Sequence, residues 1–172
     1  MRPFSLADAS EVQRLAGDRS IADTTLNVPH PYEQGMAEGW ISTHQPKFEA
    51  RELVTFAITL HDDAQLIGAI NLKLDVDADR AELGYWIGKP WWNRGYCTEA
   101  AVAVIDYGFR VLNLNRINAT HLARNPASGR VMQKAGMAHE GVARQHVKKW
   151  GLHEDLVLYG LLRETWARAE PK

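Results

Sequence analysis

Apolar and polar residues alternate most regularly in the middle of the chain, where the pattern predicts β-strands. Residues 53–60 place four apolar side chains on one face, and this period of two is typical of a half-buried strand. Acidic turns separate this segment from two further strand-like runs, at residues 65–74 and 80–87. The three runs therefore predict an antiparallel meander.

A helical period replaces the alternation after the meander. In residues 98–112 the apolar positions recur with the i, i+3, i+4, i+7 spacing of a helix that buries one face. Asn125 and Pro126 predict the start of a shorter helix, which runs to Lys134 and has Gly136 as its C-cap. Other helices are predicted at residues 6–15 and 32–48, and other strands at residues 115–122, 137–148 and 156–162.

The order of these elements indicates an α+β or mixed α/β layer fold. The strands at residues 80–87 and 115–122 are expected to be parallel neighbours, because a helix joins them by a right-handed crossover. A chain of 172 residues, 45% of them hydrophobic, can bury a sizeable core. Residues 1–172 are therefore predicted to form a single domain.

Charge and cysteine content argue against several functional classes. The formal net charge of −1 gives no general attraction to nucleic acid or to an anionic membrane, so neither is an expected partner. The single cysteine, Cys97, allows no internal disulfide, and the seven histidines lack ligand spacing, so no metal is expected. No apolar stretch approaches the roughly 20 residues of a membrane span. The first residues lack the apolar core of a signal peptide, so the expected location is cytoplasmic.

The segment from Arg94 to Ala100 carries the most informative chemistry. A glycine turn that opens a helix presents unpaired N–H groups and the positive end of the helix dipole, which together bind anions. Arg94 adds a cation suited to phosphate oxygens. One hypothesis is therefore a cofactor with a pyrophosphate group. The other is an ordinary turn at Gly95 followed by an N-cap at Thr98, and the segment alone leaves both open.

Four segments in this order resemble the GNAT superfamily of acyl-CoA N-acyltransferases, and within it the RimJ/RimL-like branch of ribosomal-protein N-terminal acetyltransferases. They are AELGYWI (residues 81–87), WNRGYCTEA (residues 92–100), NPASGRVMQKAGM (residues 125–137) and the hairpin at residues 150–159. The resemblance implies a GNAT-like fold. Its central twisted, mixed, mostly antiparallel sheet has about seven strands, the first at residues 2–4, and is flanked by helices. Its fourth and fifth strands splay apart, helped by a bulge.

The resemblance also implies an activity: transfer of an acetyl group from acetyl-CoA directly to a primary amine. The foremost acceptor is the α-amine of a protein or peptide N-terminus. A small-molecule amine, such as an antibiotic, a polyamine or an amino-acid derivative, is the alternative acceptor. A non-catalytic acyl-CoA-binding module is the alternative to an enzyme. Relatives often pair, so a homodimer is an open alternative to a monomer.

Glu82 is the expected general base of such an enzyme. Strand alternation places it on one face with Gly84 and Trp86, and by resemblance this strand lines the acceptor cleft. A base there frees the amine lone pair, directly or through a water. The alternatives are a solvated carboxylate and a salt-bridge partner for Arg80.

Two further groups are expected to handle the thioester. A backbone N–H near Ile87 is a candidate donor to the thioester oxygen, which gains negative charge during transfer. By resemblance Ser128 lies near the cofactor sulfur, where it either protonates the thiolate or only hydrogen-bonds it. Tyr85 and Tyr159 are the alternative acids.

The residues expected to bind acetyl-CoA come from the end of the third meander strand, the glycine turn and the short helix. They are Trp86, Ile87, Gly88, Arg94, Gly95, Tyr96, Cys97, Thr98, Asn125, Ser128, Arg130 and Lys134. Two residues depart from the family pattern: Trp92 stands in place of Gln or Arg, and Cys97 in place of a small residue. The thiol of Cys97, at a helix N-terminus, is expected to have a lowered pKa. Trp40 is expected either to line the acceptor cleft or to belong to the core.

Overall fold

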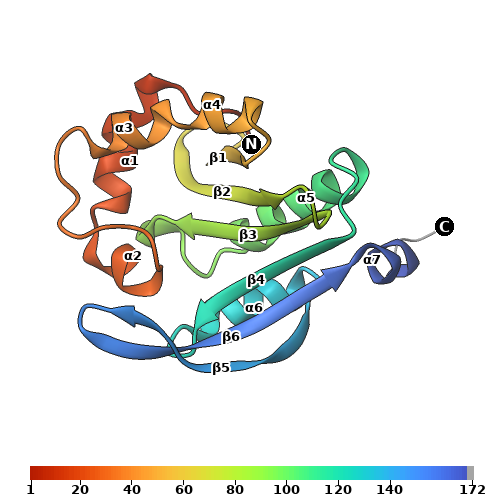
Figure 1. Ribbon diagram of the computed structural model, residues 1–172. Coiled ribbons are helices and arrows are strands. Elements are labelled where there is room, and N and C mark those ends of the chain that lie inside the picture. The colour runs from red at the N-terminus through yellow and green to blue at the C-terminus, as the bar shows by residue number, and fades with distance from the viewer. Residues whose placement is uncertain (170–172) are drawn as a thin grey trace.

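A single six-stranded sheet, in the order β1-β2-β3-β4-β6-β5, forms the centre of the computed structural model (Figure 1), which describes residues 1–169. The strands are β1 (Leu53–Thr59), β2 (Leu66–Asp75), β3 (Arg80–Ile87), β4 (Arg116–Leu122), β5 (Ala138–Lys149) and β6 (Leu152–Leu162). Neighbouring strands are antiparallel except β3 and β4, which are parallel as the sequence predicted. The mixed, mostly antiparallel fold is thereby confirmed.

The sheet has one strand fewer than the predicted seven. Residues 2–4 do not form a strand, and Arg2 makes only an isolated bridge to Ala57. The amide of Arg2 donates to the carbonyl of Ala57 at 3.2 Å, and the reverse bond measures 2.8 Å. Pro3 follows directly and has no N–H with which to continue the ladder.

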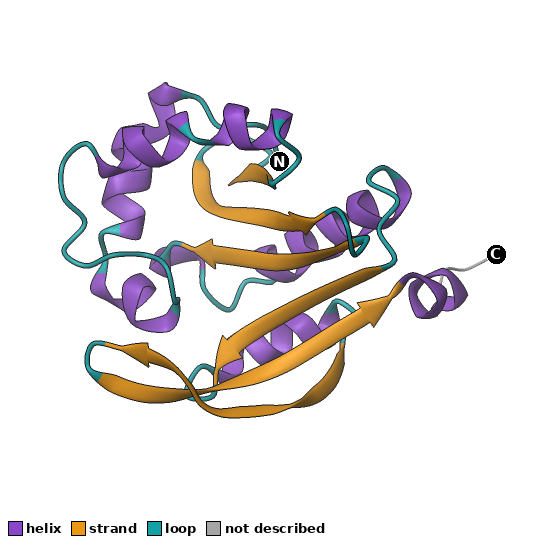
Figure 2. Cartoon of the chain, in the orientation of Figure 1, coloured by secondary structure: helices purple, strands orange, loops and turns teal. Residues whose placement is uncertain are grey.

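Helices lie on both faces of the sheet (Figure 2), with α1, α3 and α4 beside β1 and β2, α2 near the end of β3 and the turn between β5 and β6, and α5 and α6 behind the sheet. The helices are η1 (Leu6–Asp8), α1 (Ala9–Ala16), α2 (Arg19–Thr24), α3 (Met36–Ser42), α4 (His44–Glu49), η2 (Lys89–Trp91), α5 (Tyr96–Arg110), α6 (Pro126–Lys134) and α7 (Arg163–Ala169). The core has two parts. Leu72, Ile105 and Phe109 belong to the larger cluster, which packs α5 against the sheet. Val12 and Ala57 belong to the smaller one, under α1 and α3.

Two helices differ from their prediction. The helix predicted at residues 32–48 is broken into α3 and α4, because Pro46 has no N–H to donate to the carbonyl of Ser42. Residues 32–35 of the predicted helix are not helical, since Gly35 is the N-cap of α3 and adopts the left-handed conformation at φ 86°. Helix α5 begins at Tyr96, two residues before the predicted Thr98, and Gly95 is its N-cap at φ 87°. Helices α2 and α7 were not predicted.

Strands β3 and β4 diverge soon after they meet. Their register ends with the pair Glu82 and Asn118, although β3 continues to Ile87 and β4 to Leu122. This is the predicted splay. The predicted bulge is wrong, because β3 pairs with β2 in unbroken register along its whole length. The strands separate by diverging in direction, and β3 keeps an edge that no strand covers among residues 1–169.

Candidate active site

Two cavities meet where β3 and β4 diverge. The α5-side cavity, of about 460 Å³, lies between the end of β3, the glycine turn and helices α5 and α6. The α3-side cavity, of about 530 Å³, lies between the sheet and the segment from α1 to α3. Five residues line both: Thr24, Thr25, Tyr85, Trp86 and Ser128. We call these five the junction. A molecule in one cavity can therefore reach a molecule in the other there.

Nearly all residues predicted to bind acetyl-CoA line the α5-side cavity, the exceptions being Gly88 and Arg94. The amide of Gly88 instead donates to the carbonyl of Ile67 at 2.8 Å. Arg94 is exposed, and its neighbours Asn93 and Gly95 contribute to the cavity wall.

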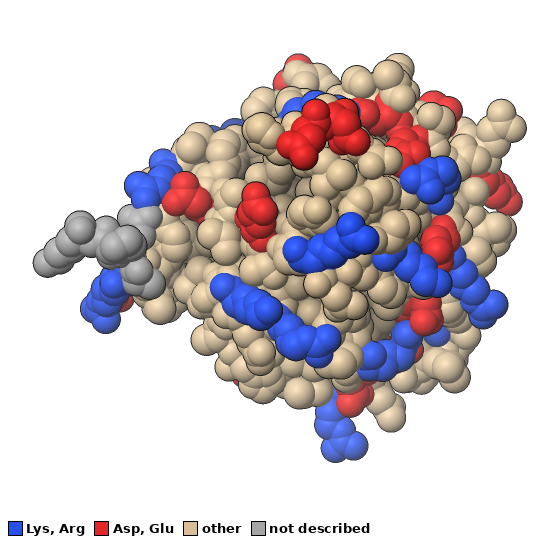
Figure 3. Space-filling view, turned by 180° about the vertical axis from the view of Figure 1, so that it is seen from behind, with Lys and Arg blue, Asp and Glu red and all other residues tan. Residues whose placement is uncertain are grey.

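The start of α5 gives the α5-side cavity an anion-binding end. The amides of Tyr96, Cys97 and Thr98 belong to the first turn of this 15-residue helix and have no acceptor within it. They line the cavity together with Arg130 and Lys134 of α6, whose cationic side chains are exposed. Figure 3 shows Lys and Arg side chains across the middle of the molecule's rear face, where α5 and α6 lie. This end suits phosphate groups.

The free edge of β3 borders the same cavity. Bonding alternates along an antiparallel pair, and the bond from Gly88 to β2 turns the amides of Tyr85 and Ile87 away from β2, toward the divergence. The indole N–H of Trp92 donates to the carbonyl of Ile87 at 2.6 Å and fixes the end of the strand. Trp92, read from sequence as a departure from the family pattern, thus has a structural role. An extended amide chain can pair with this edge as an added strand.

A tyrosine and a serine hydroxyl meet at the junction. The Tyr85 hydroxyl lies 2.9 Å from Ser128 Oγ and 3.0 Å from the Ser128 carbonyl oxygen. Burial raises the pKa of the Tyr85 phenol above its ordinary value, so this group stays protonated at neutral pH. Tyr159, the other predicted acid, lines neither cavity, and its hydroxyl accepts from Gln133 Nε2 at 3.0 Å.

The short helix α6 begins as predicted. Asn125 caps it by accepting from the amide of Ser128 at 3.4 Å, and Pro126 occupies the first turn. The Asn125 side chain also donates to the carbonyl of Thr24 at 3.1 Å. This second bond ties α2 to α6 across the divergence, and no sequence pattern pointed to it because α2 itself was not predicted.

Glu82 lines the α3-side cavity, as does Trp40. The Glu82 carboxylate is exposed and accepts from the hydroxyl of Thr120 on β4 at 3.4 Å. It is not the partner of Arg80, which pairs with Asp75 at 2.8 Å. The carboxylate is therefore available to a molecule in the cavity.

His121 lines the α3-side cavity but was not predicted as a site residue. Its ring is buried, and Nδ1 lies 2.8 Å from the carbonyl oxygen of Leu122. A carbonyl oxygen only accepts, so Nδ1 carries a proton in this contact. Nε2 packs against Gly129, where a Cβ atom would lie 2.7 Å away. Strand alternation gave no reason to select His121, since it falls on the face opposite Thr120.

The expectation of a lowered pKa for Cys97 is wrong. Burial raises the pKa of its thiol to about 12, because a thiolate there would lose its hydration. The favourable helix N-terminus was visible in the sequence, but the burial was not. Among residues 1–169, no group of three or more His, Cys, Asp or Glu side chains is placed to hold a metal ion. None of the helices described is long and apolar enough to cross a bilayer.

The family model described as "Acetyltransferase (GNAT) domain" matches residues 1–138. The chain belongs to the GNAT family. Probable N-acetyltransferase YjcK of Bacillus subtilis (strain 168) is 32% identical over 167 residues, which cover 94% of this chain and 92% of that protein. The [ribosomal protein uS5]-alanine N-acetyltransferase of Escherichia coli (strain K12) is 32% identical over 107 residues, covering 61% and 55% respectively. A crystal structure of a probable acetyltransferase matches with a TM-score of 0.84 at 29% identity, covering 96% of this chain and 93% of that one.

This GNAT protein is an acetyl-CoA-dependent N-acetyltransferase, and its acceptor is an amine. The α5-side cavity fits acetyl-CoA in three respects. It has a strand edge without a partner for an amide-containing arm, a helix N-terminus for phosphates, and two cations beside them. At the junction this cavity opens into the α3-side cavity.

Proposed function

We propose that this GNAT enzyme acetylates the α-amine at the N-terminus of a protein or peptide, which enters through the α3-side cavity. The charged lining of that cavity supports the proposal most directly, since Glu82 and Lys73 contribute one charge of each sign. A polycationic acceptor would be favoured by several carboxylates. A polypeptide also needs an open approach, and no helix stands in front of β4 and β6 in Figure 2. The relative that acts on a ribosomal protein points in the same direction.

In this proposal the residues of the α5-side cavity hold the cosubstrate. The first amides of α5 bind its pyrophosphate, and Arg130 and Lys134 bind its remaining phosphate. The edge of β3 near Ile87 pairs with its amide-containing arm. When bound, acetyl-CoA supplies an acetyl group activated as a thioester. The amide of Ile87 faces the same opening and donates to the oxygen that gains negative charge.

Glu82 acts as the general base through water. It lies four residues before Trp86, about 13 Å along the strand, so its carboxylate does not touch an amine bound at the junction. An α-amine has a pKa near 7.7–8.0, so a modest base is sufficient. Thr120 holds the carboxylate toward the cavity. Tyr85 and Ser128 keep a proton at the junction. Ser128 Oγ–H would protonate the leaving sulfur as the carbon–sulfur bond breaks, Tyr85 would give its proton to Ser128, and the proton that the amine releases through water would restore the Tyr85 phenol.

Steady-state kinetics on an acceptor panel tests the proposed function. The panel contains N-terminal peptides, spermidine and single amino-acid amides, with acetyl-CoA as donor. We expect peptides to be acetylated with the highest kcat/KM, and Glu82→Gln to lower kcat by about 100-fold, as loss of a general base does. Tyr85→Phe and Ser128→Ala should each lower kcat with little change in acetyl-CoA affinity.

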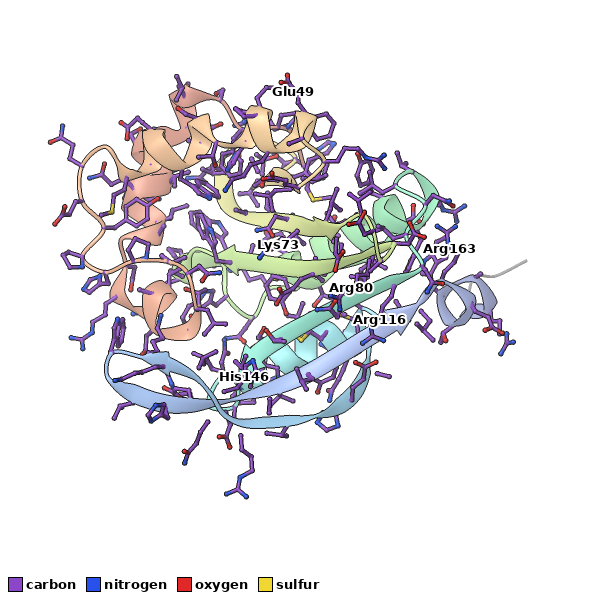
Figure 4. The ribbon with its side chains drawn as sticks, viewed as in Figure 1. Glu49, Lys73, Arg80, Arg116, His146 and Arg163 are labelled. Atoms are coloured by element: carbon purple, nitrogen blue, oxygen red, sulfur yellow. The ribbon has the colours of Figure 1, made fainter. Side chains whose placement is uncertain are left out.

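Glu49→Gln is the matched control, because Glu49 is exposed on α4 and lines neither cavity (Figure 4). Its kinetics should equal those of the unmodified enzyme. Unchanged turnover in Glu82→Gln would remove Glu82 from the mechanism. Acetylation of small amines without acetylation of any peptide would overturn the assigned acceptor.

A further inference from the structure

Lys73 lies directly beside the proposed base. It is paired with Glu82 in the register of β2 and β3, so the two side chains stand on the same face of the sheet. Both side chains are exposed and both line the α3-side cavity. Figure 4 labels Lys73 on the strand next to β3, with Arg80 and Arg116 toward the end where β3 and β4 are still paired.

The ammonium group of Lys73 has no partner among residues 1–169, whether by hydrogen bond or ion pair. The two arginines labelled near it differ in this respect. Arg80 pairs with Asp75 at 2.8 Å, and Arg116 pairs with Glu140. Even Glu82, its cross-strand neighbour, bonds to Thr120. Lys73 is therefore a cation at the cavity wall whose charge is available to a ligand.

Lys73 is also the sole Lys or Arg among the described residues that line the α3-side cavity. The rest of the wall is aromatic, aliphatic or neutral polar, apart from Glu82 and His121. An ammonium group binds a carboxylate more strongly than a neutral amide, since a charge-assisted hydrogen bond is roughly twice as strong as a neutral one. This wall can thus discriminate between acceptors by charge.

The position of Lys73 sets how far the recognised group lies from the reacting amine. Lys73 is four residues along β2 from the strand partner of Trp86, which corresponds to about 13 Å. An extended peptide advances about 3.3 Å per residue, so two residues and their side chains cover much of that span, and the flexible lysine stem covers the rest. We propose that Lys73 selects acceptors with an acidic side chain at the second or third residue after the acetylated amine.

This inference rests on the proposed peptide acceptor, and matched peptides separate the two. The substrates are C-terminally amidated tetrapeptides that begin with Ala and carry either Glu or Gln at position two, three or four. We expect kcat/KM to be about tenfold higher for Glu than for Gln at position two or three. The preference should shrink as salt is added.

Lys73→Met keeps the length of the side chain and removes its charge, and we expect it to bring the Glu-to-Gln ratio to about one. Lys148→Met is the control, because Lys148 is exposed on β5 and lines neither cavity. It should leave the ratio unchanged. Lys73→Glu should reverse the preference, so that a peptide with Lys at position two exceeds the Gln peptide.

The possible results point to different conclusions. Equal acetylation of Glu and Gln peptides by the unmodified enzyme overturns the inference and leaves the proposed function standing. An equal loss of kcat on both peptides in Lys73→Met, with the ratio retained, also overturns it, since Lys73 would then act only by positioning Glu82. Acetylation of small amines alone overturns the proposed function itself.

Discussion

His44, a single side chain under the N-terminal helices, has no hydrogen-bond partner for either buried ring nitrogen in the part of the chain described. Its ring packs edge-on against Phe4 and Trp40, with centroid distances of 5.3 and 4.4 Å. Burial lowers the pKa of His44 to about 4. Because Trp40 lines the α3-side cavity, protonation of the neighbouring His44 ring would disturb a wall of the site as well as the core.

We expect His44 to make stability depend on pH between about 6.5 and 4. In this range the unfolded chain binds a proton at His44 and the folded chain does not, so stability falls as the pH is lowered. The difference amounts to at most about 3 kcal/mol, at 1.36 kcal/mol per pKa unit. Denaturant unfolding at a series of pH values measures it.

His44→Phe is the informative variant in that series, because it keeps the aromatic packing and removes the titration. Its stability should change less between pH 6.5 and 4 than that of the unmodified protein. Parallel curves for the two proteins would show that His44 does not titrate differently on folding. The dependence of stability on pH that remains in His44→Phe comes from carboxylates such as Asp8, whose pKa is lowered by its hydrogen bonds to Arg2.

The contacts of the site depend on residues that are distant in the chain. Residue types and a family resemblance were sufficient to select Glu82 and Ser128 as candidates, and the structure places both on the cavity walls. The contact between Tyr85 and Ser128 spans 43 residues and exists only because β3 and β4 diverge. The burial of Cys97 depends on tertiary packing in the same way. Such features have no local pattern from which they could be predicted.

Among the elements, the turn into α5 shows how one backbone conformation shapes the α5-side cavity. Gly95 adopts φ 87°, and an ideal Cβ there would meet nothing within 4 Å. Replacement therefore costs backbone strain alone, without a clash. This turn orients the first amides of α5, which line the cavity.

Gly95→Ala is expected to lower the free energy of unfolding by about 1 kcal/mol, the cost of a left-handed residue with a Cβ. Acetyl-CoA affinity should fall several-fold, because α5 begins less readily at Tyr96. Gly95→Asn should lower the free energy of unfolding and the acetyl-CoA affinity less than Gly95→Ala does, since Asn tolerates this conformation. Calorimetric titration together with denaturant unfolding measures the two effects. Full affinity in Gly95→Ala would show that the amides reach the ligand without this turn geometry.

The predictability of elements followed their length and regularity. The meander and α5 have long periodic patterns and were predicted well. Helix α2 has six residues, too few for a helical period to stand out, and it was missed. Pro46, a residue visible in the sequence, broke the predicted helix at residues 32–48, so this error was avoidable.

At the scale of the whole molecule, the sheet consists of two halves with little pairing between them. Strands β1 to β3 and strands β4 to β6 share three register pairs, and α5 forms the covalent crossover. Side-chain hydrogen bonds add links across the divergence: besides those of Glu82 and Tyr85, Asn125 donates to the carbonyl of Thr24 and Lys149 to that of Thr25. A ligand between β3 and β4 would add a further link between the halves.

We therefore expect acetyl-CoA to stabilise both halves together. At 100 times its Kd a ligand adds about 2.7 kcal/mol, which for a chain of this size corresponds to a rise in Tm of roughly 5–10 °C. Hydrogen exchange should slow in β3 and in β4 alike. ATP and NAD at the same concentration are the controls, and they should change neither the Tm nor the hydrogen-exchange rates. Protection confined to α5 and α6 would show that the ligand does not bridge the halves.

The residues that line the two cavities come largely from different parts of the sequence. Half of the residues that line the α3-side cavity come from the first 40 of the chain, whereas the α5-side cavity is built almost wholly from residues 85–134. Mutation or recombination near the 5′ end of the coding sequence can therefore change half of the α3-side wall while most of the α5-side wall is retained. A single recombination event with its crossover in the loop before β1 would then change which amines a descendant enzyme acetylates.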